Sequence, residues 1–391
     1  MKKLITSSVL LAAAVSASAA PLVTIGDQLD LFFKGAVIGK WDSNITYTSD
    51  KNKQLNDYSS VFRLGAEADY GRNSKFKANV KFYEDLTRYA DQKQFNSNLA
   101  HVAANASYTE ANYSIKGVFS FDQRFQNSAT TTEANQTGSL VRFNSWLAGA
   151  EGTYDFSEKL FGELGVNWNR TEYLGNWSDL YADNDVYSVP VSLLYKVTQK
   201  VSVGLTYQYR YTEFTGGQSS YADRYGSERE DHFAGVTVRG DILPKLNASA
   251  YAGIAYRDIK DAQSSDDTTF ALRATLSYEL TEKIGLFATG KRDFGNGASR
   301  QSSVDTGCEF GANYMMNQFV MFTTSFAYTY TDYISGYDRE DDEFCGRIGV
   351  SYKPNKFLTL GANYRYLDNS SSVKTASYMQ HLVDISVSVK Y

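Results

Sequence analysis

The last nine residues of the chain, Val383-Asp384-Ile385-Ser386-Val387-Ser388-Val389-Lys390-Tyr391, alternate strictly between apolar and polar side chains. A period of two residues predicts a β-strand with one apolar face and one polar face. The apolar face carries five residues: Val383, Ile385, Val387, Val389 and Tyr391. The same alternation recurs along most of the chain, so we take this strand as the unit from which the fold is built.

The composition argues against two broad classes of protein. Mean hydropathy is -0.40, and no uninterrupted apolar span of about 20 residues follows the N-terminal segment, which argues against a helical membrane protein. A transmembrane β-barrel shows only alternate side chains to lipid, so it keeps a soluble-like mean hydropathy. The formal net charge of -5 argues against nucleic acid as a partner.

The N-terminal segment, residues 1–19, has the pattern of a secretory signal peptide. Two lysines are followed by an apolar run from Leu4 to Val15 and by the small-residue box Ala17-Ser18-Ala19. A basic start, a short apolar core and a small-residue cleavage site define such peptides. We therefore expect a mature domain over residues 20–391.

The mature chain alternates between amphipathic strands, tight turns and longer polar loops. Tight turns recur roughly every 35 to 47 residues, the interval of one hairpin plus its loop, and are found at 70–74, 109–112, 157–159, 198–200, 243–245, 281–283, 316–318 and 353–356. Longer polar stretches lie between them, at 49–57, 88–97, 125–138, 173–184, 215–230, 259–267, 295–302, 331–341 and 367–376. Eight turns plus nine loops make seventeen connections, hence eighteen strands, with sixteen as the fallback if the weakest pair fails.

Strand length separates a membrane barrel from a soluble β-sandwich, whose strands are about 5 or 6 residues long. The predicted strands run to roughly 10 to 14 residues, which a tilted strand needs to cross a bilayer. Tyrosines gather near outward strand ends, as in the aromatic girdles of outer-membrane barrels. The sequence thus predicts an all-β, antiparallel up-and-down transmembrane barrel with both termini on the short-turn side.

Two local features lead to specific expectations. Pro190 lies inside an otherwise regular strand and lacks the N–H that a closed ladder requires, so we expect a β-bulge there, near the outer end of its strand. By alternation, Cys308 should face lipid and Cys345 the lumen, on strands that are not neighbours. We therefore expect no disulfide between them.

The N-terminal third contains Gly39-Lys40-Trp41-Asp42-Ser43-Asn44-Ile45 and, after it, Asp57-Tyr58-Ser59-Ser60-Val61. This pair of motifs resembles the first hairpin of the β-barrel porins of Gram-negative outer membranes, over roughly residues 31–90. The closing strand 383–391, with its terminal aromatic residue, is similar to the signal that the barrel-assembly machinery reads. The resemblance implies a cell outer-membrane location, periplasmic termini, and contact with lipid and lipopolysaccharide.

The inward face of the predicted strands is polar and charged. An eighteen-strand barrel is too wide to be filled by its own wall side chains, so we expect an aqueous channel. Basic candidates for the lumen include Arg63, Lys81, Lys116, Arg210, Arg239, Arg257, Arg273, Arg347 and Arg365, and acidic candidates include Glu67, Glu151, Glu163 and Glu309. The excess of arginine suggests a weak anion preference, unless these arginines are paired with acids across the wall.

Three further readings concern the loops and the histidines. The loop 125–138 either folds inward and narrows the pore, or stays outside and leaves a wide one. His101, His232 and His381 show no spacing typical of catalysis or of a metal site, so we expect no enzymatic activity, cofactor or metal. Acidic runs at 228–231, 266–267 and 338–343 are either solvated or hold calcium that bridges lipopolysaccharide phosphates.

Two functions of different class follow. The first is a porin-like channel for passive diffusion of small hydrophilic solutes. The second is a non-conducting structural or surface-associated barrel that serves polysaccharide export or adhesion. The sequence leaves the solute and the oligomeric state open.

Overall fold

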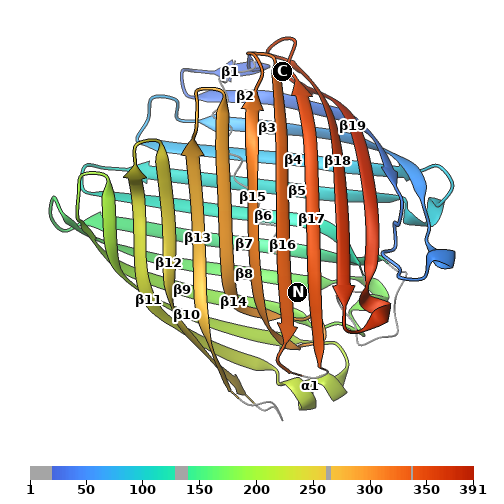
Figure 1. Ribbon diagram of the computed structural model, residues 1–391. Helices are drawn as coiled ribbons and strands as arrows, with labels where there is room; N and C mark the ends of the chain where they lie inside the picture. Colours follow the sequence, from blue (N-terminus) through green and yellow to red (C-terminus); the bar gives the residue numbers. More distant parts are fainter. Residues whose placement is uncertain (1–19, 128–139, 261–265, 336–337) are drawn as a thin grey trace.

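The computed structural model describes residues 20–127, 140–260, 266–335 and 338–391. Eighteen long strands form one closed antiparallel ring in which each strand pairs with the next in sequence and the last, β19, pairs with β2. A three-residue strand, β1, pairs with the start of β2. Figure 1 shows the wall, with the C-terminus at one end of the barrel and the helix α1 at the other. The predicted eighteen-strand barrel is confirmed.

The strands are β1 Val23–Ile25, β2 Leu29–Asp42, β3 Asp57–Tyr70, β4 Phe76–Tyr89, β5 Ser97–Thr109, β6 Tyr113–Asn127, β7 Leu140–Asp155, β8 Leu160–Tyr173, β9 Asp183–Lys196, β10 Val201–Thr215, β11 Glu228–Leu243, β12 Leu246–Lys260, β13 Asp267–Glu279, β14 Ile284–Asn296, β15 Ser302–Met315, β16 Val320–Tyr333, β17 Arg339–Tyr352, β18 Leu358–Ser371 and β19 Tyr378–Lys390. The described helices are α1 Ser219–Tyr225 and short 3-10 turns at Lys51–Lys53, Lys93–Phe95, Gly175–Trp177 and Lys374–Ala376.

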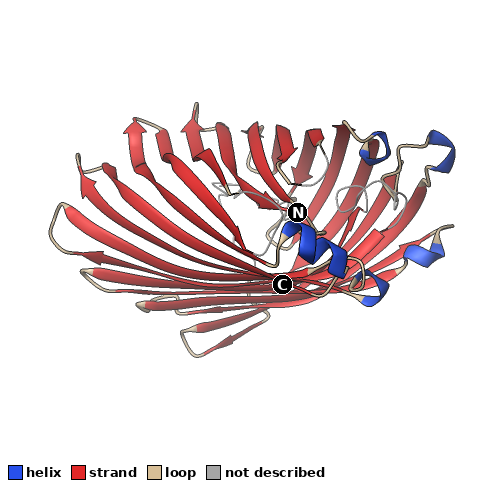
Figure 2. Cartoon of the chain, turned by 90° about the horizontal axis from the view of Figure 1, so that it is seen from below, coloured by secondary structure: helices blue, strands red, loops and turns tan. Residues whose placement is uncertain are grey.

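We call the end of the barrel with the short connections the turn end, and the opposite end the loop end. Figure 2 views the barrel from the loop end, where the helical turns lie. Both α1 and the connection between β14 and β15 belong to this end. The 3-10 turns and α1 break up loops that the sequence presented only as polar stretches.

The alternation of faces follows the predicted pattern. Outward apolar side chains are well exposed, as for Leu205 (70%) and Ile385 (63%), which is the surface a bilayer would cover. Exposed tyrosines lie outward at the turn end, at Tyr70, Tyr113, Tyr154, Tyr195, Tyr278, Tyr352 and Tyr391. Cys308 is exposed, Cys345 is buried, and both are free thiols. Among the described residues, no helix combines the length and the apolarity needed to cross a bilayer.

The expectation for Pro190 was wrong in two respects. The register between β8 and β9 is the same on either side of it, Leu164 with Val191 and Asn167 with Ser188, so no extra residue forms a bulge. Two pairs of the ladder are simply missing, and Pro190 lies in the middle of β9 rather than near its end. A glycine faces the proline ring: a Cβ added to Gly165 would lie 2.9 Å from Cγ of Pro190. Because Gly165 has no Cβ, the wall has room for the proline ring at the place where the two backbone pairs are missing.

Candidate functional site: the narrowed loop end of the lumen

The tip of the β14–β15 hairpin departs from the barrel wall. The ladder between β13 and β14 ends at Leu272 and Arg292, although β14 goes on pairing with β15 as far as Asn296 and Ser302. Beyond Arg292 the two strands of the hairpin therefore stay together while β13 is left behind. We call residues 293–305 the hairpin tip.

The connection within the hairpin tip, residues 297–301, is almost fully buried, although it links two strands at the open end of a barrel. Ala298 is 1% exposed and packs against Val141 and Tyr173. Its carbonyl accepts a hydrogen bond of 3.0 Å from the backbone N–H of Ala182. Arg300 donates to the carbonyl of Gly216, at 2.8 Å. These partners belong to the β7–β10 part of the barrel, so the hairpin tip folds inward and reaches across the inner wall of β11–β13.

Two fully buried arginines hold the hairpin tip in this position. Arg257 forms a bidentate ion pair with Asp231, at 2.6 and 2.8 Å, and donates to the carbonyl of Gly295 at 2.8 Å. Arg229 donates to Oδ1 of Asn296 at 2.5 Å and to the carbonyl of Arg300. Guanidinium groups can bridge several acceptors from one rigid fork, which suits them to this task.

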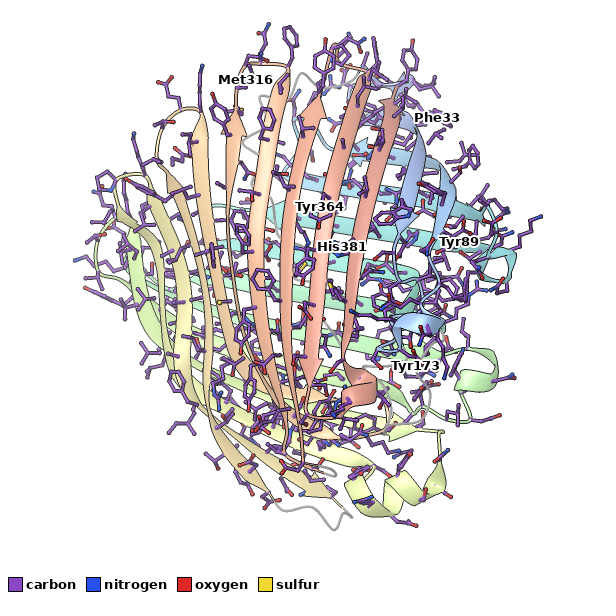
Figure 3. The ribbon with its side chains drawn as sticks, turned by 45° about the vertical axis from the view of Figure 1, so that its right-hand side comes forward. Phe33, Tyr89, Tyr173, Met316, Tyr364 and His381 are labelled. Carbon is purple, nitrogen blue, oxygen red and sulfur yellow. The ribbon has the colours of Figure 1, made fainter. Side chains whose placement is uncertain are left out.

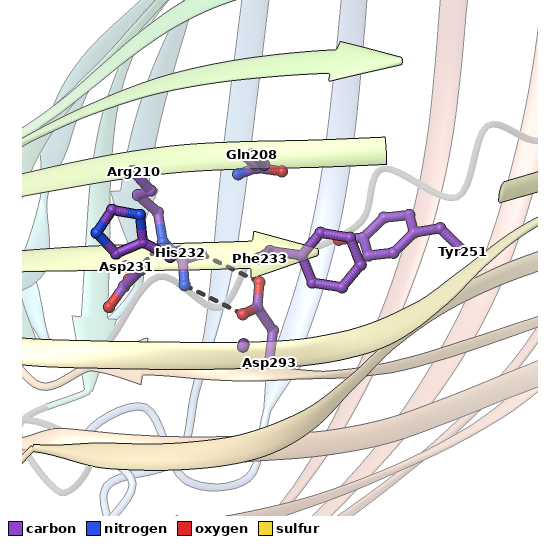
Figure 4. Close-up of a pocket in the computed structure, with 8 residues that line it drawn as sticks. Gln208, Arg210, Asp231, His232, Phe233, Tyr251 and Asp293 are labelled. Carbon is purple, nitrogen blue, oxygen red and sulfur yellow. Dashed lines mark hydrogen bonds and ion pairs between the residues drawn. The ribbon is translucent and has the colours of Figure 1, made fainter. Parts of the chain in front are cut away.

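A third arginine connects this network to the open lumen. Arg210 binds Asp231 through Nε at 2.6 Å and Asp293 through both terminal nitrogens, at 3.0 and 3.1 Å. Figure 4 shows Arg210 and Asp293 beside the rings of Phe233 and Tyr251, in a small pocket on the inner wall.

Charged side chains of both signs surround the hairpin tip. They are Arg210, Arg229, Arg257 and Arg300, with Asp231, Asp293 and Asp305. Other buried charges at the loop end, such as Asp57, Asp185, Arg339 and Asp341, lie outside this group. Burial lowers the pKa of Arg300, the member of this set that lies outside the strands. In a medium of low effective dielectric, one uncompensated charge acts over a longer distance than in water.

The other predicted lumen residues fall into two groups. Several are paired with an opposite charge: Arg63 with Asp85 at 2.6 Å, Arg347 with Glu309 at 3.2 Å, Arg239 with Glu163, and Glu67 with Lys34 and Lys390. Within the described residues, the second group has no opposite charge within 4.0 Å: Lys81, Lys116, Glu151, Arg273 and Arg365. Four of these five are basic.

His101 has a partner that the sequence analysis missed. Its Nδ1 lies 2.8 Å from Oδ1 of Asp122, and its ring stacks on Tyr83 with centroids 4.5 Å apart. The tight turn at 109–113 fixes the register of this hairpin, and counting back along both strands sets His101 opposite Asp122. That register was the signal available in the sequence.

The other two histidines face outward. Nδ1 of His232 lies 2.8 Å from the hydroxyl of Tyr207, and Nδ1 of His381 lies 2.8 Å from that of Tyr364. Figure 3 shows Tyr364 and His381 together on the wall. Both pairs are exposed, so neither lines the lumen.

The acidic runs are only partly loops. Residues 228–231 lie in β11, where Asp231 is buried in the network described above, and residues 339–343 lie in β17. The prediction of an acidic loop at these places was wrong, because the strands begin earlier than expected. Within a strand, alternate residues face opposite sides of the wall, so the acids do not form one group. Residues 128–139 of the predicted inward loop 125–138 lie outside the described residues, and residues 125–127 belong to β6.

Comparison with known proteins gives a family match for the C-terminal part of the chain. Residues 222–391 match the family Putative beta-barrel porin 2. The match covers β11 to β19, including the hairpin tip, and it confirms the predicted resemblance to β-barrel porins, although it lies outside the residues 31–90 from which that resemblance was drawn. No curated protein matches the chain.

Solved structures of proteins from Pseudomonas aeruginosa also match the chain. OccK5 (OpdH) is 12% identical, with a TM-score of 0.46, over 93% of this chain and 98% of that one. OccK2 (OpdF), solved in complex with glucuronate, is 8% identical, with a TM-score of 0.48, over 93% and 98%. OpdL is 13% identical, with a TM-score of 0.45, over 94% and 99%.

The family match over residues 222–391 and the closed ring agree with the predicted β-barrel of the porin type. In this barrel, the Trp41-Asp42-Ser43-Asn44 box lies where the two ends of the wall meet. The ladder between β2 and β19 ends at Asp42 and Leu382, and the box continues it with side chains. Ser43 Oγ accepts from the N–H of His381 at 2.8 Å, and Asn44 donates to the carbonyl of Met379 at 3.0 Å.

The C-terminal strand of the chain occupies the other side of this seam. Its five apolar residues, Val383, Ile385, Val387, Val389 and Tyr391, all face outward and are exposed. Tyr391 and Phe33 exchange backbone hydrogen bonds of 2.6 and 2.9 Å, which continues the pairing of β19 with β2 to the last residue.

Proposed function

We propose that this porin is a passive channel for small hydrophilic solutes with a weak anion preference, narrowed at its loop end by the hairpin tip. In this proposal the loop end faces the outside of the cell and both termini are periplasmic. Residues 1–19 are a signal peptide, and the strand 383–391 is read by the barrel-assembly machinery. Lipid and lipopolysaccharide cover the outer wall.

One observation carries the proposal: two arginines of the inner wall lack an acidic partner close by. Arg273 and Arg365 stand on the wall without a carboxylate within ion-pair distance among the described residues. The group around the hairpin tip adds four guanidinium groups and three carboxylates. An excess of one sign at the narrowest part of a pore biases ion choice.

The test is single-channel recording in planar bilayers followed by reversal potentials in a salt gradient. Stable conductance steps with a reversal potential of the anion-selective sign are expected. Arg273→Gln and Arg365→Gln should each shift the reversal potential toward the cation-selective side. Cation selectivity of the unmodified protein would overturn the anion preference and leave the channel itself intact.

A second candidate is the non-conducting barrel for polysaccharide export or adhesion. The inward position of the hairpin tip and its packing against Val141, Tyr173 and Tyr181 favour it, because they obstruct the lumen. A correctly folded barrel that gives no conductance steps would replace the channel with this function.

A further inference from the structure

The inward course of the hairpin tip leaves an interruption in the wall of the barrel. Residues Asp267–Ala271 of β13 pair with β12 but have no strand partner on the side of β14, since the ladder ends at Leu272 and Arg292. Within the described residues, the other side of this interruption is residues 293–296 of β14, which stay paired with β15. We call this interruption the β13–β14 gap.

The β13–β14 gap lies at the height of the membrane rather than above it. Thr268 pairs with Tyr256, and Phe270 pairs with Ile254. The side chains of Ile254, Tyr256 and Phe270 are outward and exposed. The gap therefore extends from the level of a girdle tyrosine down into the apolar band of the outer wall.

An unpaired strand edge at this height is costly. Backbone N–H and C=O groups that face lipid without partners cost several kcal/mol each, which is why membrane barrels close completely. Among the described residues, two side chains of β13 contact the backbone of Asp267–Ala271. Oδ1 of Asp267 accepts from the N–H of Thr268 at 2.7 Å, and Thr269 Oγ1 lies 3.5 Å from the carbonyl of Phe270. A polar ligand group at the edge would remove that cost.

The inner side of the gap is apolar, in contrast to the rest of the lumen. Phe294 and Val304 of the hairpin tip pack there against Ala271, Phe233 and Ala255. An alkyl chain that entered through the gap would find this cluster directly behind the wall, and it could take the place of Phe294 and Val304 against Ala271.

The base of the gap carries a cation. Arg292 lies at the last pair of the ladder and donates to Oγ1 of Thr306 at 2.6 Å. No carboxylate lies within ion-pair distance of it among the described residues. A carboxylate headgroup at the outer surface would give Arg292 a charged partner.

We propose that the β13–β14 gap is a lateral route between the lumen and the outer leaflet of the membrane, and that its ligand is a single-chain amphiphile with a carboxylate headgroup. The headgroup binds Arg292 and the free edge of β13, and the chain passes over Phe294 and Val304. When the hairpin tip returns to the wall, β14 pairs with β13, the route closes and the axial pore widens.

The experiment uses a disulfide to close the gap. Continuing the register from Leu272 and Arg292 by two residues makes positions 270 and 294 cross-strand neighbours once β14 rejoins β13. The test protein therefore carries Phe270→Cys and Phe294→Cys in a Cys308→Ser, Cys345→Ser background. The matched control carries Ala274→Cys and Gly290→Cys, which already pair in the intact ladder, and a Cβ at Gly290 meets no atom within 4 Å.

The probe is dodecanoate with a photoreactive diazirine on its chain, and labelled peptides are identified by mass spectrometry. In the reduced test protein, labelling of peptides that carry Phe233, Ala255 and Val304 is expected. Oxidation should reduce it about tenfold and raise the axial conductance, whereas oxidation of the control pair should change neither. Arg292→Gln should weaken labelling by dodecanoate but leave labelling by the dodecanol analogue unchanged.

Labelling that persists after the test pair is oxidised would overturn the lateral route. If the test pair does not oxidise, Ala271→Trp provides the same comparison, because its indole fills the space behind the gap; unchanged labelling in that variant overturns the proposal too. Axial conductance of the reduced protein is measured separately, so failure of the lateral route and failure of the channel can be told apart.

Discussion

Two ladders of this barrel, β5–β6 and β13–β14, stop before the loop end, and the exposed backbone has different partners at the two sites. The ladder between β5 and β6 ends at His101 and Asp122, and that between β13 and β14 ends at Leu272 and Arg292. At the first site, Oε1 of Gln123 accepts from the N–H of Ala100 at 3.1 Å. At the same site, Arg142 reaches from β7 to the carbonyl of Asn98, at 3.2 Å.

At the second site, β13 covers part of its own edge, since Oδ1 of Asp267 accepts from the N–H of Thr268 at 2.7 Å. Within the described residues, no side chain of a neighbouring strand does so, and the arginines nearby bind the hairpin tip instead. Arg257 and Arg229 hold Gly295 and Asn296 on the inside of the wall. The comparison teaches that a short ladder is not in itself an opening. Side chains that replace the missing backbone partners seal one interruption, whereas side chains that draw a strand inward maintain the other.

The largest effect is expected from Arg257→Ala at the second site. Loss of this guanidinium leaves the carbonyl of Gly295 and part of Asp231 without a buried partner, which should cost about 3–5 kcal/mol of stability. The hairpin tip should be released, so single-channel conductance should rise. Denaturant unfolding and planar-bilayer recording measure the two effects.

The control for Arg257→Ala is Arg273→Ala, which removes an inward arginine with no carboxylate within 4.0 Å among the described residues. It should change selectivity with little loss of stability. If both variants lose the same stability, the hairpin tip is not held by Arg257, and the contrast between the two interruptions fails.

A smaller loss of stability is expected when the side-chain contact at the end of the β5–β6 ladder is removed. Gln123→Ala should leave the N–H of Ala100 unpaired and cost about 1–3 kcal/mol. Conductance should stay the same, because β6 remains paired with β7 on its other side. A large change in conductance would mean that this interruption too governs the pore, and the distinction drawn above would then be lost.

The interruption at Pro190 provides a third case. Gly165→Ala should lower the free energy of unfolding by about 1 kcal/mol, the low end for overpacking, because its Cβ would lie 2.9 Å from Cγ of Pro190. Gly290→Ala should lose no stability through overpacking, since nothing lies within 4 Å of its Cβ. Unfolding by denaturant compares them, and equal losses would show that the missing pairs at Pro190 are not set by the fit of its ring.

The smallest effect concerns the turn end of the β5–β6 hairpin. A hydrogen bond from Lys75, and then one from Tyr108, lowers the pKa of Glu110 below its ordinary 4.5. A lowered folded-state pKa gives stability that is present above the unfolded value and lost as the pH falls through the folded value. The melting temperature of the unmodified protein should therefore slightly exceed that of Glu110→Gln at neutral pH and equal it in acid. A difference that grows in acid would reverse the sign of this linkage.

The sequence predicted the wall well, because each strand reports its own two faces. The outward position of Cys308 and the outward face of the last strand follow from alternation, and the number of strands follows from the count of turns and polar loops. The inward hairpin tip could not be found in this way. It depends on Arg229 and Arg257, which lie on different strands and meet the tip only through the register of the barrel.

Available signals were partly misread. Arg257 was predicted to face the lumen, but Arg229 was grouped with a polar loop, so the two were not seen as a pair. The constriction was sought in residues 125–138 because this polar stretch lies between the fifth and sixth strands, where general porins have an inward loop. The structure shows an inward-folded connection at 297–301, which is among the shortest at the loop end. Position and polarity gave no indication of its inward folding, because buried partners decide it.

The seam at Ser43 and Asn44 has a consequence for synthesis. Ser43 precedes its partner His381 by 338 residues, and Asn44 precedes Met379 by 335. The first strand therefore has no partner on this side during most of synthesis, and its backbone edge stays unpaired until β19 has been made.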